Sequence, residues 1–198
     1  MIFHIPHAST NIPLELRGSF VISDDDLENE LLLMTDHFTD DLFLPAASPE
    51  DTTLLAEVSR LVVDVERFDD DEIEVMAKQG MGVVYTQTQD GQPLRDRTAE
   101  RDELLKLYYY PHHVKLNQMV SDELGNSGSS FIIDCHSFPS KPLPYESDQS
   151  RFRPDFCIGT DPHHTPSDIV ELVVDYLTNE GYTVSINRPF AGCVIPGD

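Results

Sequence analysis

Short apolar segments rich in β-branched residues alternate with helical segments along this chain, and this alternation constrains its fold most strongly. The central apolar segments are apolar on both faces, which is typical of strands covered by helices on both sides of a sheet. The segments that predict strands are residues 2–6, 58–66, 80–88, 131–135, 155–159 and 182–187. The sequence therefore predicts an α/β fold.

Helical spacing of apolar residues marks the segments that alternate with these strands. Residues 24–42 predict a helix with Ser23 as its N-cap and with acidic residues in its first turn, where the helix dipole stabilises them. Two further helices are predicted, one over residues 97–124 with an interruption at Pro111 and an amphipathic one over residues 166–179.

The charge of the chain excludes some classes of partner. The 198 residues are 39% apolar, which is enough for the core of one domain, although 36 acidic residues stand against 13 basic ones. The formal charge of −23 argues against nucleic acid and anionic membrane surfaces, because both require clustered Lys and Arg. A small anionic molecule can still bind where a few Arg side chains converge in one cleft.

The cysteines and the N-terminus indicate a cytoplasmic protein. Three widely spaced cysteines, Cys135, Cys157 and Cys193, form no CxxC motif and predict neither a disulfide framework nor a four-thiolate zinc site. The first residues lack the basic and apolar regions of a signal peptide. No apolar run approaches the roughly 20 residues needed to span a bilayer.

Two predicted strands end in histidines, and this feature points to a metal. His7 follows the first strand, and His136, in the sequence FIIDCHS, follows the strand at residues 131–135. Ligands of α/β sheets bind beyond the carboxyl ends of the strands. Two imidazoles and one carboxylate are a usual set for catalytic zinc, with a fourth position for water. The alternative is that each histidine is simply hydrogen-bonded at the end of a strand.

The carboxylate of this predicted metal set is Asp36. In one straight helix over residues 24–42, Asp36 would point roughly opposite to Leu27. The site therefore requires a break near Thr35, with Thr35 capping a second short helix. His37 is the alternative third ligand.

Neighbouring residues on the strand before His136 point to opposite faces of the sheet. Cys135 shares a face with Phe131 and Ile133, so it is predicted to be a buried thiol rather than a nucleophile. Asp134 shares the other face with His136. This placement suits a metal ligand and a carboxylate that orients it.

Arg60 and Arg67 are the candidate anion-binding residues, in the segment VSRLVVDVERF. An Arg at the end of a strand can hold a substrate carboxylate in a bidentate pair. The alternative is a surface ion pair with the acidic run at residues 69–72.

Eight motifs together resemble the N-formylglutamate amidohydrolase (N-formylglutamate deformylase) family over nearly the whole chain. They are PHAST (6–10), TDHFTDDLF (35–43), SRLVVDVERF (59–68), GVVYTQTQDGQPL (82–94), YYPHHVKL (109–116), IIDCHSFPS (132–140), RPDFCIGT (153–160) and NRPFAGCVI (187–195). This family is a relative of the zinc carboxypeptidases and aspartoacylases. The resemblance therefore implies a three-layer α/β/α fold around a mixed central sheet, and one zinc ion, with another divalent metal as the alternative.

The resemblance also implies roles for particular residues. His136 in DCHS matches the second zinc histidine of the superfamily, and His7 in PHAST takes the place of the first. The superfamily's histidine-x-x-glutamate motif is absent, since Thr10 stands three residues after His7. Asp36 is the implied third ligand, because the family usually carries Asp there.

The strand VVDVER resembles the motif of aspartoacylases in which an arginine binds the substrate carboxylate. Arg67 is therefore the implied anion binder, with Arg60 as the second cation. Glu66 stands where that motif has asparagine, which adds a negative charge to the implied anion site and leaves the exact substrate open. The base of the family is a glutamate after the PFAG segment. We therefore expect this glutamate, with a final strand and helix, beyond Asp198.

The implied reaction is hydrolysis of N-formyl-L-glutamate to formate and L-glutamate, as at the end of histidine degradation. The substrate is then a small anionic N-acyl amino acid. Two alternatives remain from the sequence: hydrolysis of another N-acyl amino acid or peptide amide, and a non-catalytic binding protein with the same fold.

Overall fold

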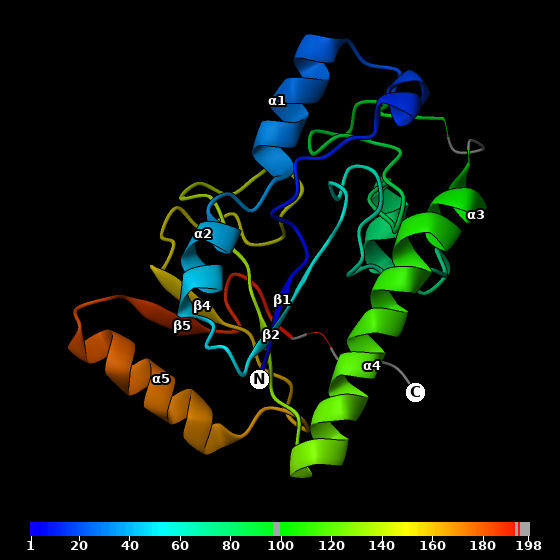
Figure 1. Cartoon of the computed structure of the whole chain (residues 1–198). Coiled ribbons are helices and arrows are strands. Elements are labelled where there is room, and N and C mark those ends of the chain that lie inside the picture. The colour runs from blue at the N-terminus through cyan, green and yellow to red at the C-terminus, as the bar shows by residue number, and fades with distance from the viewer. Residues whose placement is uncertain (97–99, 193, 195–198) are drawn as a thin grey trace. The chain divides into compact units, whose positions relative to one another are not determined.

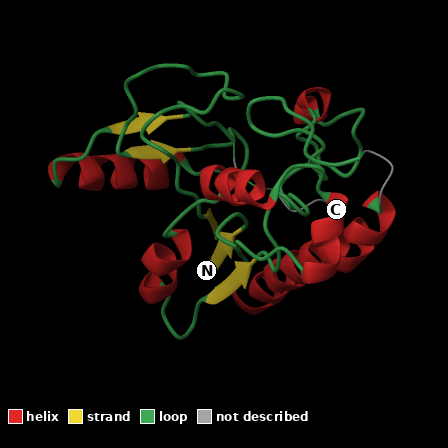
Figure 2. Ribbon diagram, turned by 90° about the horizontal axis from the view of Figure 1, so that it is seen from above, coloured by secondary structure: helices red, strands yellow, loops and turns green. Residues whose placement is uncertain are grey.

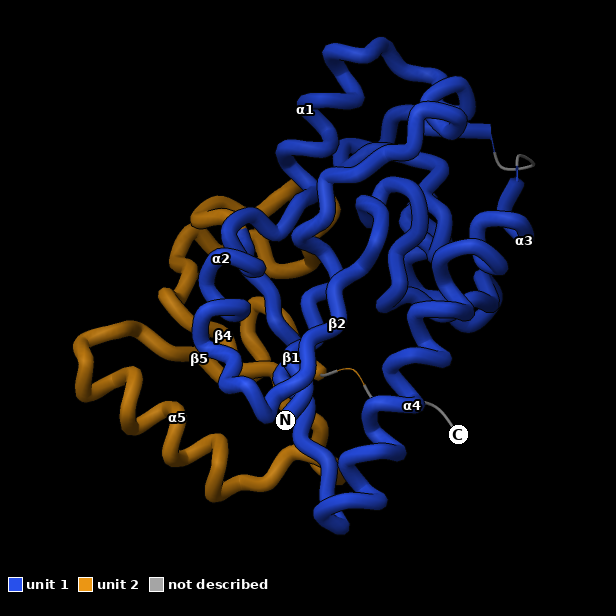
Figure 3. The backbone as a smooth tube through the Cα atoms, in the orientation of Figure 1, with its two compact units in different colours: residues 1–138, 196–198 blue, residues 139–195 orange. Residues whose placement is uncertain are grey.

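Two compact units make up the described part of the protein. The computed structural model describes residues 1–96, 100–192 and 194. Unit 1 contains residues 1–138, and the described residues between 139 and 195 form unit 2 (Figure 3). Each unit contains its own small parallel sheet, so the structure is a mixed α/β protein, as the sequence predicts.

The sheet of unit 1 is parallel and has β1 at its centre, in the order β2-β1-β3 (Figure 1). Its strands are β1 (Ile2–Ile5), β2 (Thr52–Leu55) and β3 (Ile132–Asp134). All four residues of β1 are buried, as expected of a central strand. In the register of the sheet, His4 lies opposite Asp134. The pairing of β1 with β3 thus joins segments separated by about 130 residues in the sequence.

The helices of unit 1 are mostly short, apart from the first and the last. They are α1 (Asp24–Met34), α2 (Thr39–Phe43), α3 (Arg101–Leu104), the π-helical segment Leu105–Tyr109 and α4 (Tyr110–Ser127), with short 3-10 helices at Leu14–Ser19, Leu44–Ala46 and Val75–Gln79.

The predicted break in the helix over residues 24–42 is confirmed, but its cap is not the one expected. Ser23 caps α1 by accepting a hydrogen bond from the backbone N–H of Asp26. Thr35 ends α1 rather than starting α2, because its hydroxyl donates to the carbonyl of Leu31 at 2.7 Å. Phe38 is the N-cap of α2, with a φ of 63°. The prediction that Thr35 caps the second helix is therefore wrong.

The strands predicted over residues 58–66 and 80–88 are also wrong. Both segments are irregular, and Figure 2 shows the loops that make up much of the chain between the short strands. Their apolar side chains are buried, and their backbones are joined by the hydrogen bond from the N–H of Asp64 to the carbonyl of Val83. The β-branched residues of these segments indicate burial and not strand structure, because a buried loop can have the same composition as a buried strand. No strand was predicted from the sequence at the position of β2.

The helix predicted over residues 97–124 is present in a modified form. Residues 97–99 lie outside the described residues, and α3, the π-helical segment and α4 follow one another without a gap. Pro111 lies in the first turn of α4, where its missing N–H is tolerated. The expected interruption thus takes the form of a π-helical segment directly before this turn.

Unit 2 contains the strands β4 (Phe156–Ile158) and β5 (Val184–Ile186), paired in parallel, and the helix α5 (Ser167–Asn179). These three elements confirm the strands predicted over residues 155–159 and 182–187 and the helix predicted over residues 166–179. Among the described residues, no helix is both long and apolar enough to cross a membrane.

The buried loop over residues 58–65 generates a prediction about stability. We expect Leu61→Ala to lower the free energy of unfolding by about 2–5 kcal/mol, because the side chain is fully buried and its removal leaves a cavity. The matched control is Leu14→Ala, since Leu14 is 86% exposed and its loss is expected to cost at most about 0.5 kcal/mol. Urea unfolding measures both, and equal values for the two variants would contradict a packed loop.

Candidate metal site

Three potential metal ligands meet at the carboxyl edge of the sheet in unit 1. His7 follows β1, His136 follows β3, and Asp36 lies in the bend between α1 and α2. Their ligand atoms lie within 4.8 Å of one another. The Nδ1 atom of His136 is 2.9 Å from Asp36 Oδ2, and the Nδ1 atom of His7 is 3.8 Å from the same oxygen. The structure therefore brings together the three residues that the sequence selects as ligands.

Local backbone structure explains how Asp36 reaches the two histidines. Strands β1 and β3 are parallel neighbours, so the residues after them leave the sheet at the same edge. The N–H of Asp36 donates to the carbonyl of His7 at 3.0 Å, which fixes the bend after α1 against the end of β1. His37 is half-buried on this bend, and its ring is hydrogen-bonded to the carbonyl of Leu32. Asp36 is thus the residue of this pair that faces the histidines.

Carboxylates contact the Nε2 atoms of both His7 and His136. The Nε2 atom of His7 is 2.9 Å from Asp64 Oδ1. The Nε2 atom of His136 is 3.3 Å from Glu66 Oε2 and 3.4 Å from Asp134 Oδ2. A carboxylate that accepts the Nε2 proton leaves Nδ1 free to bind a metal, and such partners are usual around histidine ligands. Asp134 and His136 are in contact, as their shared face predicts.

The donors present fit a divalent metal. The Nδ1 atom of His7 is buried and has no hydrogen-bond partner. A buried polar atom without a partner costs free energy, which a bound cation would offset. Two imidazole nitrogens and one carboxylate oxygen are the set that zinc prefers at catalytic sites. The Nδ1 atoms of His7 and His136 both face Oδ2 of Asp36, at 3.8 and 2.9 Å.

The ionisable groups in this cluster stabilise one another as ions. Burial alone would raise the pKa of Asp36, but the hydrogen bond from His136 and the charge of the nearby His7 imidazole outweigh burial and hold that pKa well below its usual range. Burial alone would lower the pKa of His136, but the neighbouring carboxylates of Glu66, Asp134 and Asp36 raise it well above its usual value. Without a metal, a proton on His136 therefore partly compensates the negative charge around it.

Asp64, a fully buried carboxylate beside this cluster, contacts the side chains of Arg60 and Arg67. Its Oδ2 atom accepts hydrogen bonds from Tyr85 at 2.6 Å and from Arg60 at 2.9 Å, and lies 3.6 Å from Nε of Arg67. Burial alone would raise the pKa of Asp64, but Arg60, His7 and Arg67 outweigh it and hold that pKa well below its usual range. Asp64 is thus an ionised centre that links the arginines to His7.

The two predicted anion-binding arginines differ in their surroundings. The side chain of Arg60 is 9% exposed, and its Nη1 atom is also 3.7 Å from Asp36 Oδ1. The side chain of Arg67 is 22% exposed, and its buried Nε makes no hydrogen bond.

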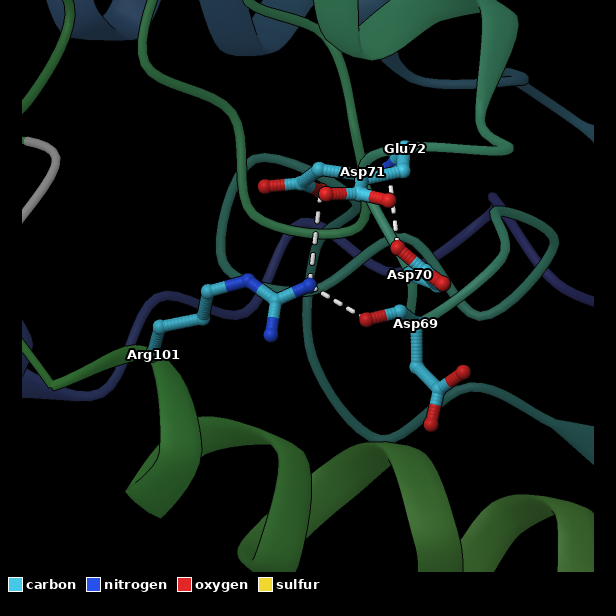
Figure 4. Close-up of a pocket in the computed structure, with 5 residues that line it drawn as sticks. All are labelled: Asp69, Asp70, Asp71, Glu72 and Arg101. Carbon is cyan, nitrogen blue, oxygen red and sulfur yellow. Dashed lines mark hydrogen bonds and ion pairs between the residues drawn. The ribbon is translucent and has the colours of Figure 1, made fainter.

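The acidic run at residues 69–72 pairs with a different arginine. Arg101 of α3 donates to the carbonyl of Asp69 and lies 3.3 Å from Asp71 Oδ1 (Figure 4). Together with Asp70 and Glu72, these residues line an open pocket at the surface.

Cys135 is a buried thiol, as the sequence predicts. Its side chain is 1% exposed, and Sγ donates to the carbonyl of Ile133 at 3.2 Å. Burial, together with the charge of Asp134, raises the pKa of this thiol to about 12. A thiol that stays protonated at neutral pH is a poor nucleophile. These contacts do not support a role for Cys135 in hydrolysis.

The sequence did not single out His4 or Tyr85, which the structure places beside the site. His4 pairs with Asp134 at 2.8 Å, and Tyr85 donates to Asp64. One signal was available for His4, because it is a polar residue inside the otherwise apolar strand IFHI. Tyr85 gave no such signal, since its segment was assigned to a strand.

An α/β fold with histidines and carboxylates at the strand ends is typical of metal-dependent hydrolases. The model of one family, N-formylglutamate amidohydrolase, matches residues 1–197. The chain therefore belongs to the N-formylglutamate amidohydrolase family.

Two solved structures share the fold. N-formylglutamate amidohydrolase from Ralstonia eutropha JMP134 has a TM-score of 0.84 and 24% identity, over 97% of this chain and 73% of that chain. A gene product from Agrobacterium tumefaciens has a TM-score of 0.63 and 17% identity, over 96% of this chain and 69% of that chain. A comparison with curated proteins gives no match.

The cluster generates a prediction about metal binding. We expect Asp36→Asn to weaken zinc binding by more than about 100-fold, because loss of a partner outside the ligand shell alone costs about 10–100-fold. Asp70→Asn, in the surface pocket, is the control and is expected to leave zinc affinity unchanged. Competition with a chromophoric chelator measures both affinities. Equal affinity of the two variants would exclude Asp36 as a ligand.

Proposed function

We propose that this chain is a zinc-dependent amide hydrolase that converts N-formyl-L-glutamate to formate and L-glutamate. The observation that carries the proposal is the cluster of His7, Asp36 and His136 in a member of the N-formylglutamate amidohydrolase family. The donor types in this cluster suit zinc, and another divalent metal is the alternative.

The residues of the cluster have separate tasks in this proposal. His7, Asp36 and His136 would hold the metal, which when bound supplies a Lewis acid and lowers the pKa of a water molecule. Asp64 orients His7 by accepting the proton of its Nε2 atom, at 2.9 Å. Asp134 orients His136 in the same way, at 3.4 Å. The resemblance implies a glutamate as the base that takes the proton of the water.

We propose that Arg67 binds a carboxylate of the substrate. Its side chain is partly exposed, so an anion can reach it, and its Nε has no hydrogen-bond partner inside the protein. A planar guanidinium can bind a carboxylate through two parallel hydrogen bonds, which would fix the substrate relative to the metal. Arg60 is the second proposed cation of this substrate site, deeper in the protein and already paired with Asp64.

This proposal predicts metal-dependent release of formate. We expect the zinc-loaded protein, expressed to its natural stop codon, to release formate from N-formyl-L-glutamate, and a strong chelator to remove that activity. Added zinc should restore it, because the chelator removes the metal and leaves the protein intact. A coupled formate dehydrogenase assay measures the product, and the Asp36→Asn variant serves as the control for metal-independent hydrolysis. Formate release that persists at full rate after verified removal of the metal would contradict the proposal.

A specific observation favours a second substrate class. Glu66 Oε2 lies within 3.6 Å of the Nε2 atoms of both His7 and His136, so its carboxylate belongs to the site. With Asp36, Asp64 and Asp134, it makes four carboxylates around the two histidines, and Asp36 and Asp64 also contact the guanidinium groups of Arg60 and Arg67. This excess of carboxylates over guanidinium groups favours an N-acyl amino acid or peptide amide with fewer negative charges than N-formyl-L-glutamate. A panel of formylated and acetylated amino acids compares the two classes.

The charges of Arg67 and Glu66 predict opposite changes in KM for N-formyl-L-glutamate when each residue is replaced by Gln. Arg67→Gln removes a charged hydrogen-bond donor and is expected to raise KM about 10–100-fold. Glu66→Gln removes a like charge and is expected to lower KM by about 3–10-fold. Steady-state kinetics of the two variants at one ionic strength provide the measurement. A rise in KM for Glu66→Gln would instead assign Glu66 a binding or positioning role.

Three further features belong to the same proposal. We propose that the units form parts of one domain, with the three-layer arrangement and mixed central sheet of the carboxypeptidase-like fold. We also propose that the protein acts in the cytoplasm, where the free thiols of Cys135 and Cys157 would remain reduced. Its place would be at the end of histidine degradation.

A further inference from the structure

A chain of buried polar side chains lies behind the candidate metal site. His112 of α4 and His4 of β1 are joined through their Nε2 atoms, 2.9 Å apart. The Nδ1 atom of His4 is 2.8 Å from Asp134 Oδ1, and the other oxygen of Asp134 is 3.4 Å from Nε2 of His136. Both His4 and His112 are buried, and the mechanism proposed above gives neither of them a task.

The protons in this chain can be assigned from the types of atoms in contact. The Asp134 carboxylate can only accept, so the Nδ1 atom of His4 donates to it. Burial lowers the pKa of His112 to about 3, so the His112 ring is neutral. The ring tautomers set the direction of the contact between the two Nε2 atoms: a His4 ring protonated at Nδ1 alone accepts the Nε2 proton of His112. Every hydrogen bond in the chain then runs toward Asp134.

The sheet itself sets the contact between His4 and Asp134. The two residues are register partners in neighbouring strands, so the position of the His4 ring follows from the pairing of β1 with β3. Each oxygen of Asp134 has its own imidazole partner, His4 at Oδ1 and His136 at Oδ2. A carboxylate held at one oxygen keeps the other aimed at Nε2 of His136. The Nδ1 atom of His136 then faces Asp36.

We propose that His4, held by His112, is a positioning residue for the metal site: it fixes Asp134, and Asp134 orients the ligand His136. This inference rests on the metal site of the proposed function, but it is independent of the substrate. Outer partners of this kind change metal affinity by about 10–100-fold when they are lost.

The donors of His4, Glu66 and Asp134 also lie within 4.8 Å of one another, which raises the question of a second cation there. Both ring nitrogens of His4 already have partners, however, and a metal on Nδ1 would replace its hydrogen bond to Asp134. The existing contacts therefore favour the positioning role.

Two variants of similar size test this role. The amide nitrogen of Asn can occupy the place of a histidine Nδ1, whereas that of Gln can occupy the place of Nε2. His4→Asn thus keeps the donor to Asp134, and His4→Gln loses it. We expect zinc affinity within about 3-fold of wild type for His4→Asn and about 10–100-fold weaker for His4→Gln. Competition with a chromophoric chelator gives the affinity, and elemental analysis gives the number of zinc ions per chain.

A second pair covers the case in which a variant at position 4 fails to fold. His112→Gln keeps a donor at the Nε2 position, and His112→Asn does not, so the first should retain more zinc affinity than the second. Circular dichroism of the metal-free proteins confirms that the compared variants are folded. Preserved affinity in the donor-keeping member of either folded pair supports the proposal.

Three outcomes overturn the inference. Equal zinc affinity within each folded pair would show that the donor does not matter, whatever the activity of the protein. A second zinc ion per chain that is lost in His4→Gln would make His4 a ligand. A wild-type protein that binds no zinc would remove the metal site and the inference together. By contrast, wild-type protein that binds zinc but releases no formate would overturn the proposed substrate alone.

Discussion

The parallel pairing of β1 with β3 is the interaction on which the rest of the site depends. It brings the segment after Ile5 and the segment after Asp134 to the same edge of one sheet. That edge places His7 beside His136, and the same register places His4 opposite Asp134. A slip of one residue would turn the side chains of β3 to the opposite face. The cluster would then lose His136 and the carboxylate that contacts it.

Charge balance is the second constraint on this structure. Asp36, Asp64 and Asp134 are buried or nearly so, and burial alone opposes their ionisation. Each is held as an ion by specific partners: imidazoles for Asp36 and Asp134, and arginines together with His7 for Asp64. Buried charges persist only when they are paired in this way or bind a metal. The abundance of carboxylates around two imidazoles is therefore a physical argument for a cation at this place.

Some parts of the fold could be predicted from local patterns, and others could not. Strand β1, the start of α1 at Ser23 and the helix α5 follow from short-range signals that the structure confirms. The strand predicted over residues 58–66 was wrong because the β-branched residues of this segment are buried in a loop. The role predicted for Thr35 was wrong because a hydroxyl can hydrogen-bond at either end of a helix. Here the hydroxyl of Thr35 reaches the carbonyl of Leu31, at the end of α1.

The sequence by itself determined the chemical types in the site. It supplied His7, Asp36 and His136 as candidate ligands, Cys135 as a buried thiol, and a family resemblance that the match over residues 1–197 confirms. Only the tertiary structure decided which carboxylate meets which imidazole, that Arg60 pairs with Asp64, and that His4 and His112 lie behind Asp134. Apart from the pair of Arg60 and Asp64, these contacts join residues far apart in the chain. Their distances follow from strand register and loop packing, which no short-range pattern encodes.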